Sequence, residues 1–216
     1  MKLVIFDCDG VLIDSELIAC TASAEALTAI GYEISCERVV ERFTGMPTEV
    51  MYRIVESELG RTLPAGFDHH LKGMVLDKFR SELQAIDGAA DVLASMETKK
   101  CVASSSNPAK LALGLIETGL FELLYPFVYS AALVERGKPH PDLFEYSANA
   151  MGVEPSDCLV VEDSVAGVTA ARAAGMKSIG FVGGSHCPAD QSDRLFEAGA
   201  VAVINNLKSL LQSRWL

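Results

Sequence analysis

The sequence has no run of about 20 apolar residues, so we expect no membrane-spanning helix. Its apolar start is interrupted by Asp7 and Asp9, which argues against a signal peptide. Basic residues are scarce: 18 Lys and Arg stand against 29 Asp and Glu, a formal net charge of −11. Because an acidic chain repels phosphate polymers and anionic lipid, neither nucleic acid nor a membrane is an expected partner. An anionic substrate would need local positive charge, from a metal ion or a few placed basic side chains.

The cysteines include no CxxC pair, and three of the six lie in or beside short apolar runs. They are Cys8, Cys20, Cys36, Cys101, Cys158 and Cys187. We interpret them as small apolar residues in a reducing compartment rather than as a disulfide framework or a zinc site. A cytoplasmic location is therefore expected.

Disorder is also excluded, because half of the 216 residues are apolar and no low-complexity linker occurs. Short, continuous apolar runs alternate with helical patterns, which predicts an α/β fold with a doubly wound, mostly parallel sheet buried on both faces. The predicted strands are 3–6, 101–103, 127–129, 159–161, 178–182 and 201–204. Helices are predicted from Asn107, Asp142 and Ser164, each stopped by a glycine.

Residues 16–83 differ from the rest because they carry no convincing strand pattern. Their first segment has apolar residues on one helical face, and three more helices are predicted to begin after Ser35, at Pro47 and at Phe67. The sequence therefore predicts two domains. Residues 1–15 and 84–216 form an α/β catalytic core, and residues 16–83 form an inserted helical cap.

Two predicted strands end in acidic pairs. Asp7 and Asp9 follow the first strand, and Glu162 and Asp163 follow the strand at 159–161. Ligands bind at the carboxyl ends of the strands in an open parallel sheet, so we expect both pairs at one edge. Such carboxylates repel one another unless a cation lies between them, and an oxygen-rich cluster suits Mg²⁺. Either pair alone is also typical of a solvated turn.

Two further motifs could bind an anion. The run of three serines and an asparagine at 104–107 stands at a predicted strand-to-helix junction, where hydroxyl and N–H groups bind phosphoryl oxygens. Lys138 lies between a glycine and a proline, so its loop is restricted, and it could offset the charge of a phosphate or a carboxylate. Taken alone, helix capping explains the serine run and solvation explains the lysine.

In this order, the four motifs resemble those of the haloacid dehalogenase superfamily. The matching residues are Asp7-x-Asp9-Gly10-Val11-Leu12-x-Asp14-Ser15-Glu16, then Ser104, then Lys138-Pro139-x-Pro141, then Glu162-Asp163-Ser164-x-x-Gly167. The resemblance covers nearly the whole chain. It is to the branch with an inserted helical cap, which holds sugar phosphatases and β-phosphoglucomutases, and the opening residues are most similar to 6-phosphogluconate phosphatase-like members.

The resemblance implies a role for each matching residue in the core. Asp7 would be the nucleophile that forms an aspartyl-phosphate, and Asp9 would be the general acid and then the base. Mg²⁺ would be held by Asp7, the backbone carbonyl of Asp9, and Asp163, with Glu162 close by. The phosphoryl oxygens would be bound by Ser104, Ser105 and Lys138.

The implied function is a Mg²⁺-dependent phosphatase of small phosphorylated sugars or sugar acids, with 6-phosphogluconate as one candidate substrate. In the cap, the resemblance points to Glu16 and to Thr44, Gly45 and Met46 as the residues that select the leaving group.

Other functions fit the residues less well. A β-phosphoglucomutase-type mutase carries a cap arginine and a histidine where this chain has Thr48 and Ala19, although Arg42 could substitute in part. A dehalogenase needs neither Asp9 nor the acid pair at 162–163. A receiver-like phospho-acceptor signalling domain is much shorter and lacks a helical insert, and a pure binding module has little use for Asp9.

The histidines are predicted to lie outside the site. His69 and His70 are adjacent, so on a helix they point about 100° apart and make a poor metal pair. His140 between two prolines is interpreted as a turn residue, and His186 beside a glycine pair as a loop residue.

Overall fold

A computed structural model describes residues 1–44, 46 and 48–212. The chain divides into two compact units, one of Met1–Asp14 with Gln84–Leu216 and one of Ser15–Leu83. In the described part of the chain, no helix is long and apolar enough to cross a membrane.

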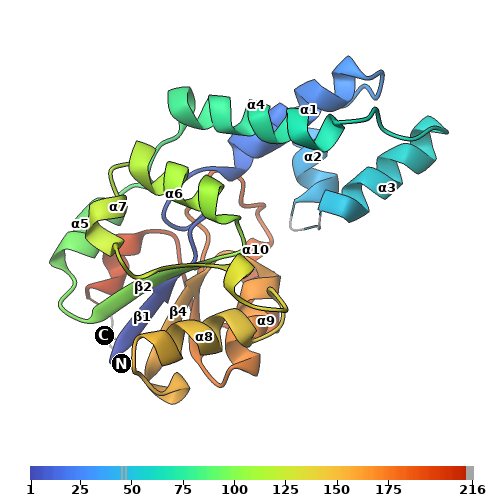
Figure 1. The fold of residues 1–216 in the computed structure, drawn as a ribbon. Coiled ribbons are helices and arrows are strands. Elements are labelled where there is room, and N and C mark those ends of the chain that lie inside the picture. Colours follow the sequence, from blue (N-terminus) through green and yellow to red (C-terminus); the bar gives the residue numbers. More distant parts are fainter. Residues whose placement is uncertain (45, 47, 213–216) are drawn as a thin grey trace. The chain divides into compact units, whose positions relative to one another are not determined.

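The first unit is built on a six-stranded sheet in the order β3-β2-β1-β4-β5-β6, with every pairing parallel (Figure 1). The strands are β1 (Leu3–Phe6), β2 (Lys99–Ser104), β3 (Val128–Ser130), β4 (Cys158–Glu162), β5 (Lys177–Phe181) and β6 (Ala202–Ile204). All four residues of β1 are fully buried, which explains why its sequence is continuously apolar rather than alternating. The predicted doubly wound parallel sheet is confirmed.

Helices cover both faces of this sheet. They are α5 (Ala89–Ser95), α6 (Pro108–Glu117), α7 (Phe121–Leu124), α8 (Asp142–Ala150), α9 (Val165–Ala173) and α10 (Gln191–Ala198). Short 3-10 turns are η1 (Ala131–Leu133), η2 (Pro155–Asp157) and η3 (Leu207–Leu210). On one face, α8 and α9 pack Phe144 and Ala170 against Ile5 and Val160. Figure 1 shows α5 and α7 on the opposite face. Alternate residues of a strand point to opposite faces, so the buried strands need cover on both sides.

The strand order places a ligand site at the end of β1. The chain runs outward from β1 through β2 to β3 and then returns to β4, which pairs with the other side of β1. Such a reversal leaves a crevice outside the carboxyl ends of the strands. Backbone pairing continues one residue past β1, because the Asp7 N–H donates to the Val161 carbonyl at 2.9 Å. Asp7 is therefore fixed at the carboxyl end of β1, where the strand order reverses.

The second unit is helical in its described residues. Its helices are α1 (Glu16–Ala29), α2 (Cys36–Phe43), α3 (Thr48–Leu59) and α4 (Phe67–Glu82). Ser35 caps α2 through its side chain, as its sequence position predicted. The core of this unit includes Leu27, Phe43 and Val55. Pro47, the predicted start of the third helix, lies outside the described residues.

The six cysteines are free thiols. Four of them are buried, at positions 8, 20, 101 and 158.

Candidate active site

The loop after β1 positions Asp9 two residues beyond Asp7. It is a tight turn in which the Leu12 N–H donates to the Cys8 carbonyl at 2.9 Å and the Gly10 N–H donates to the Ile13 carbonyl at 2.8 Å. Gly10 has a φ of +79°, and a Cβ there would lie 2.0 Å from Oδ2 of Asp163. Only glycine satisfies both the backbone angle and this close approach.

A buried ammonium connects the two acidic strand ends. Nζ of Lys138 lies 2.5 Å from Oδ1 of Asp7 and 2.7 Å from Oε1 of Glu162, and it also donates to the Ala103 carbonyl at 2.9 Å. The Lys138 side chain is 4% exposed. Burial acts to lower its pKa, but the Asp7 and Glu162 carboxylates outweigh burial and raise that pKa above its ordinary value. Lys138 therefore stays charged inside the site.

Glu162 is held at both carboxylate oxygens. Oε1 accepts from Lys138, and Oε2 accepts from the backbone N–H and the hydroxyl of Ser164, each at 2.8 Å. A Cβ on Gly167 would lie 1.8 Å from Oε1, so the first turn of α9 needs glycine to leave room for this carboxylate. Glu162 therefore supports both Lys138 and the start of α9.

Asp9 is held by groups from the end of β2 and the start of α6. Its Oδ2 accepts from the hydroxyls of Ser106 at 2.7 Å and Ser104 at 3.3 Å, and Nζ of Lys110 lies 2.8 Å from its Oδ1. Ser104 is fully buried, whereas Ser105 is exposed. The predicted residue Ser104 thus meets Asp9, and Ser106 and Lys110 join it.

Asp163 is held by the loop that follows β5. Nε2 of His186 lies 2.9 Å from Oδ2 of Asp163, and the Gln191 side chain donates to the Asp163 backbone carbonyl at 2.5 Å. Burial acts to lower the pKa of His186, but its contacts with Asp163 and with Cys187 raise that pKa to about 10. His186 is a loop residue as predicted, but it is 7% exposed and belongs to the site.

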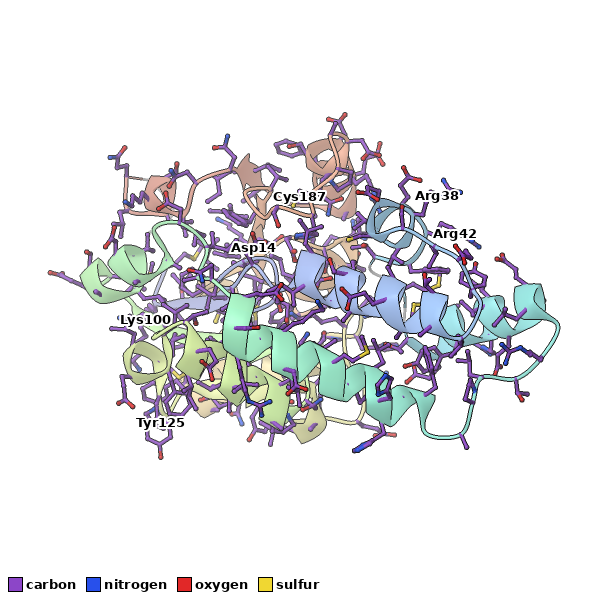
Figure 2. All side chains as sticks on the ribbon, turned by 90° about the horizontal axis from the view of Figure 1, so that it is seen from above. Asp14, Arg38, Arg42, Lys100, Tyr125 and Cys187 are labelled. Atoms are coloured by element: carbon purple, nitrogen blue, oxygen red, sulfur yellow. The ribbon has the colours of Figure 1, made fainter. Side chains whose placement is uncertain are left out.

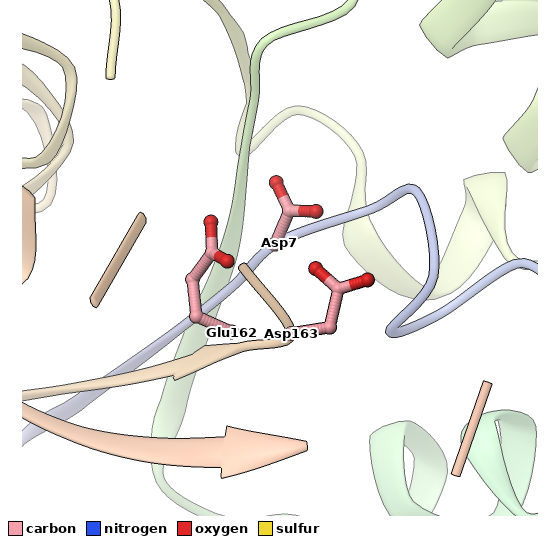
Figure 3. A group of neighbouring side chains, drawn as sticks. All are labelled: Asp7, Glu162 and Asp163. Carbon is pink, nitrogen blue, oxygen red and sulfur yellow. The ribbon is translucent and has the colours of Figure 1, made fainter. Parts of the chain in front are cut away.

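The carboxylates of Asp7, Glu162 and Asp163 form a buried cluster (Figure 3). One carboxylate oxygen from each lies within 4.8 Å of the others. Burial raises the pKa of Asp7 well above its ordinary value; Lys138 opposes this shift, and Glu162, Asp163 and Asp9 add to it. This crowding of buried negative charge fits a hard divalent cation such as Mg²⁺, which prefers carboxylate and carbonyl oxygens.

The second unit holds the predicted selecting residues. Glu16 lies in the first turn of α1, Thr44 Oγ1 lies 3.8 Å from Cys20 Sγ, and Met46 packs against the core of the unit. Gly45 lies outside the described residues.

Arg42 is engaged within the second unit (Figure 2). Its guanidinium Nη2 lies 2.6 Å from Oε1 of Glu58, and Nη1 donates to the Tyr32 hydroxyl at 2.8 Å. Thr48 begins α3. Arg42, which the sequence suggested as a partial substitute for a phosphate-binding arginine, is therefore paired with a carboxylate.

Ser106 belongs to the serine run that the sequence predicted as an anion-binding motif, whereas Lys110 and His186 were not predicted to join the core site. Lys110 carried a signal, because the predicted N-cap Asn107 accepts from the Lys110 N–H at 3.0 Å and so places position 110 in the first helical turn after the serines. His186 carried none, since it meets Asp163 only through the packing of the loop after β5.

Known proteins share this chain's sequence and fold. The family model of haloacid dehalogenase-like hydrolases matches residues 1–175. The chain is 33% identical to the 6-phosphogluconate phosphatase of Escherichia coli (strain K12) over 187 residues, which is 86% of this chain and 85% of that protein. It is 29% identical over 221 residues to the phosphorylated carbohydrates phosphatase of Thermotoga maritima, covering 98% of this chain and all of that protein.

A solved structure of a HAD family hydrolase from Deinococcus radiodurans R1, with bound phosphate and sodium, matches with a TM-score of 0.83 at 30% identity. The match covers 97% of this chain and 93% of that one. The predicted enzyme class, a phosphatase, is confirmed by the named relatives. The chain belongs to the haloacid dehalogenase-like hydrolase family.

Proposed function

We propose that this protein is a Mg²⁺-dependent phosphatase of small phosphorylated sugars or sugar acids that works through an aspartyl-phosphate on Asp7. The observation that carries the proposal is the buried Lys138 ammonium, 2.5 Å from Asp7 in a cluster otherwise rich in carboxylates. A phosphate group and a carboxylate nucleophile are both anionic, so their reaction needs fixed positive charge at the point where they meet.

The first step transfers the phosphoryl group to the protein. A carboxylate oxygen of Asp7 attacks phosphorus, the bond from phosphorus to the sugar oxygen breaks, and Asp9, protonated in the substrate complex, donates its proton to the leaving sugar oxygen. Lys138 and Ser104 are the groups we assign to the phosphoryl oxygens. Because Lys138 also contacts Asp7, it orients the nucleophile and balances its charge.

The second step releases phosphate. Asp9, now a carboxylate, accepts a proton from a water molecule as the water oxygen attacks phosphorus, and the bond from phosphorus to the Asp7 oxygen breaks. This step returns both aspartates to their starting states. Asp9 fits the role because it lies two residues after Asp7 on the same tight turn and is partly exposed at 14% of its side chain.

The metal would be held by Asp7, Asp163 and the backbone carbonyl of Asp9. When bound, Mg²⁺ would neutralise part of the negative charge on the transferring phosphoryl group. Glu162 stays in the proposed metal site, as a ligand directly or through water, because one of its oxygens lies within 4.8 Å of those of Asp7 and Asp163.

Phosphorylated sugars are the proposed substrates because two relatives act, by name, on 6-phosphogluconate and on phosphorylated carbohydrates. We assign the choice among such substrates to the second unit, including Glu16, Thr44, Gly45 and Met46. A mutase must also bind the second phosphate of a bisphosphate; the phosphatase is favoured over it because Thr48 and Ala19 stand where such a mutase carries an arginine and a histidine, and because Arg42 is paired with Glu58.

The test is phosphate release from a panel that includes 6-phosphogluconate, hexose 6-phosphates, β-glucose 1-phosphate and polyol phosphates, with Mg²⁺ present. We expect release from one or a few compounds and none with Asp7→Asn, whose fold is checked by circular dichroism. Unchanged turnover in folded Asp7→Asn would refute the assignment of Asp7 as the nucleophile. Conversion of β-glucose 1-phosphate to the 6-phosphate without phosphate release would replace the phosphatase with a mutase.

A further inference from the structure

The imidazole of His186 occupies a slot that two glycines leave open. A Cβ on Gly10 would lie 2.7 Å from Cε1 of His186, and a Cβ on Gly184 would lie 2.8 Å from the same atom. Any larger residue at either position would therefore displace the ring. The loop after β5 thus packs the ring against the catalytic turn after β1.

The ring makes its close polar contact with one carboxylate. Nε2 lies 2.9 Å from Oδ2 of Asp163, and the Cys187 sulfur lies at 3.8 Å from the same nitrogen. Nδ1 is buried and has no hydrogen-bond partner in the described part of the chain. Burying a polar atom without a partner opposes folding. Since Nδ1 makes no hydrogen bond within the described residues, the polar interaction that can give the ring a role is the one between Nε2 and Asp163.

We propose that His186 is a positioning residue for the divalent cation: it donates Nε2–H to Oδ2 of Asp163 and so holds that carboxylate in the cluster with Asp7. This inference rests on the proposed function, which gives Asp163 to the metal. His186 does not touch the metal or the substrate, and it acts through Asp163.

Electrostatic repulsion explains why Asp163 needs to be held. Oxygens of Asp7, Glu162 and Asp163 lie within 4.8 Å of one another in a buried site, so their charges favour rotation of Asp163 away from the cluster. Gln191 fixes the Asp163 backbone carbonyl, but its contact leaves the side-chain torsions to be set by other groups. The hydrogen bond from His186 sets them, as partners of metal-binding carboxylates do elsewhere.

The test compares His186→Met with His186→Gln. The two side chains have the same length, but only Gln carries an N–H group, near the position of Nε2. Mn²⁺ binds the same kinds of oxygen ligand as Mg²⁺. Its affinity for the whole protein, without substrate, can be measured from the electron paramagnetic resonance signal of free Mn²⁺, and Mg²⁺ competition then gives the Mg²⁺ affinity. We expect His186→Met to bind both ions about 10–100-fold more weakly than His186→Gln.

Two controls separate this inference from the proposed metal site. His70→Gln, on the exposed side of α4, is expected to leave metal affinity unchanged. Asp163→Asn is expected to abolish specific binding, and normal affinity in that variant would refute the metal site itself. If Asp163→Asn fails to bind but His186→Met and His186→Gln bind equally, only the role of His186 is refuted. Tighter binding by His186→Met than by His186→Gln would also overturn it.

Discussion

Replacing Lys138 with Met is the sharpest test of how the site is built. Its Nζ contacts Asp7 at 2.5 Å, Glu162 at 2.7 Å and the Ala103 carbonyl at 2.9 Å. The side chains of the two acids are 9% and 1% exposed, so water cannot replace the ammonium. Nζ lies 5.0 Å from the centre of the Phe144 ring, and a Met of similar length would keep a contact with that ring. The substitution therefore removes charge with little loss of packing.

The stability that Lys138→Met is expected to lose follows from the burial of this ion pair. Removing one partner of a buried ion pair costs about 3–5 kcal/mol, because it leaves an uncompensated charge. Small proteins have a total free energy of unfolding of about 5–15 kcal/mol, so the loss is a large share of it. For a chain of this size, about 1 kcal/mol shifts the melting temperature by about 2–4 °C. The expected shift is therefore about 6–20 °C, together with loss of turnover.

Thermal unfolding in EDTA measures the shift without a cation that could compensate. Lys110→Met is the matched control: it removes the same group from Asp9, but both side chains are partly exposed and Asp9 keeps its serine partners. We expect this control to lose about 1–2 kcal/mol of its free energy of unfolding. In a double-mutant cycle, adding Glu162→Gln should restore part of the stability that Lys138→Met loses. Equal shifts for Lys138→Met and Lys110→Met would refute the reasoning.

Three further changes test other contacts. In Gly167→Ala, the new Cβ would lie 1.8 Å from Oε1 of Glu162 and should break the contact of Glu162 with Lys138, so we expect kcat to fall about 100-fold. Gly73→Ala is the control, because a Cβ at this helical position meets open space and should leave kcat unchanged. Arg42 holds the pKa of Glu58 below its ordinary value, so Arg42→Met should lower the melting temperature at about pH 7, and this loss should shrink as the pH falls through the lowered pKa of Glu58. EDTA should stop turnover and excess Mg²⁺ should restore it; full activity in EDTA would contradict the metal site.

The strands could be predicted because burial on both faces leaves a simple pattern. Residues 3–6 are continuously apolar and form β1 with the predicted bounds. The helices with side-chain caps, after Ser35, Asn107 and Ser164, were also predictable because capping is a local interaction. The short α5 and α7 were not identified. They have 7 and 4 residues, which is too few for a 3.6-residue period to emerge, and their packing on other elements sets them.

The site was predictable to the extent that it follows from strand ends. Acids after β1 and β4 had to meet, because these strands are neighbours in a parallel sheet. The contact of Lys110 with Asp9 crosses 101 residues, and the contact of His186 with Asp163 depends on the path of a loop. The cap at Asn107 places Lys110 in the first turn of α6, but no spacing identifies Asp9 as its partner, and none encodes the contact of His186. The ion pair of Arg42 was unpredictable for the same reason, since Glu58 lies 16 residues away on another helix.

The position of Asp9 leads to a last prediction about the order of events. Ser104, Ser106 and Lys110 all direct donors at its carboxylate, so in the ligand-free protein these three side chains bind an internal anion. Ser104 is also one of the groups that we assign to the phosphoryl oxygens. An incoming phosphate must compete with Asp9 for these donors.

Asp9→Asn removes that competing charge and keeps the size of the side chain. We expect this variant to bind orthophosphate about tenfold more tightly, a gain of about 1.4 kcal/mol, while its turnover falls by about 100-fold or more. Calorimetric titration with orthophosphate in Mg²⁺ measures the first effect. Asp142→Asn is the control, because it removes an equal charge that Arg136 pairs outside the catalytic cluster. Unchanged or weaker binding in Asp9→Asn would mean that the three donors hold Asp9 alone and that phosphate binds elsewhere.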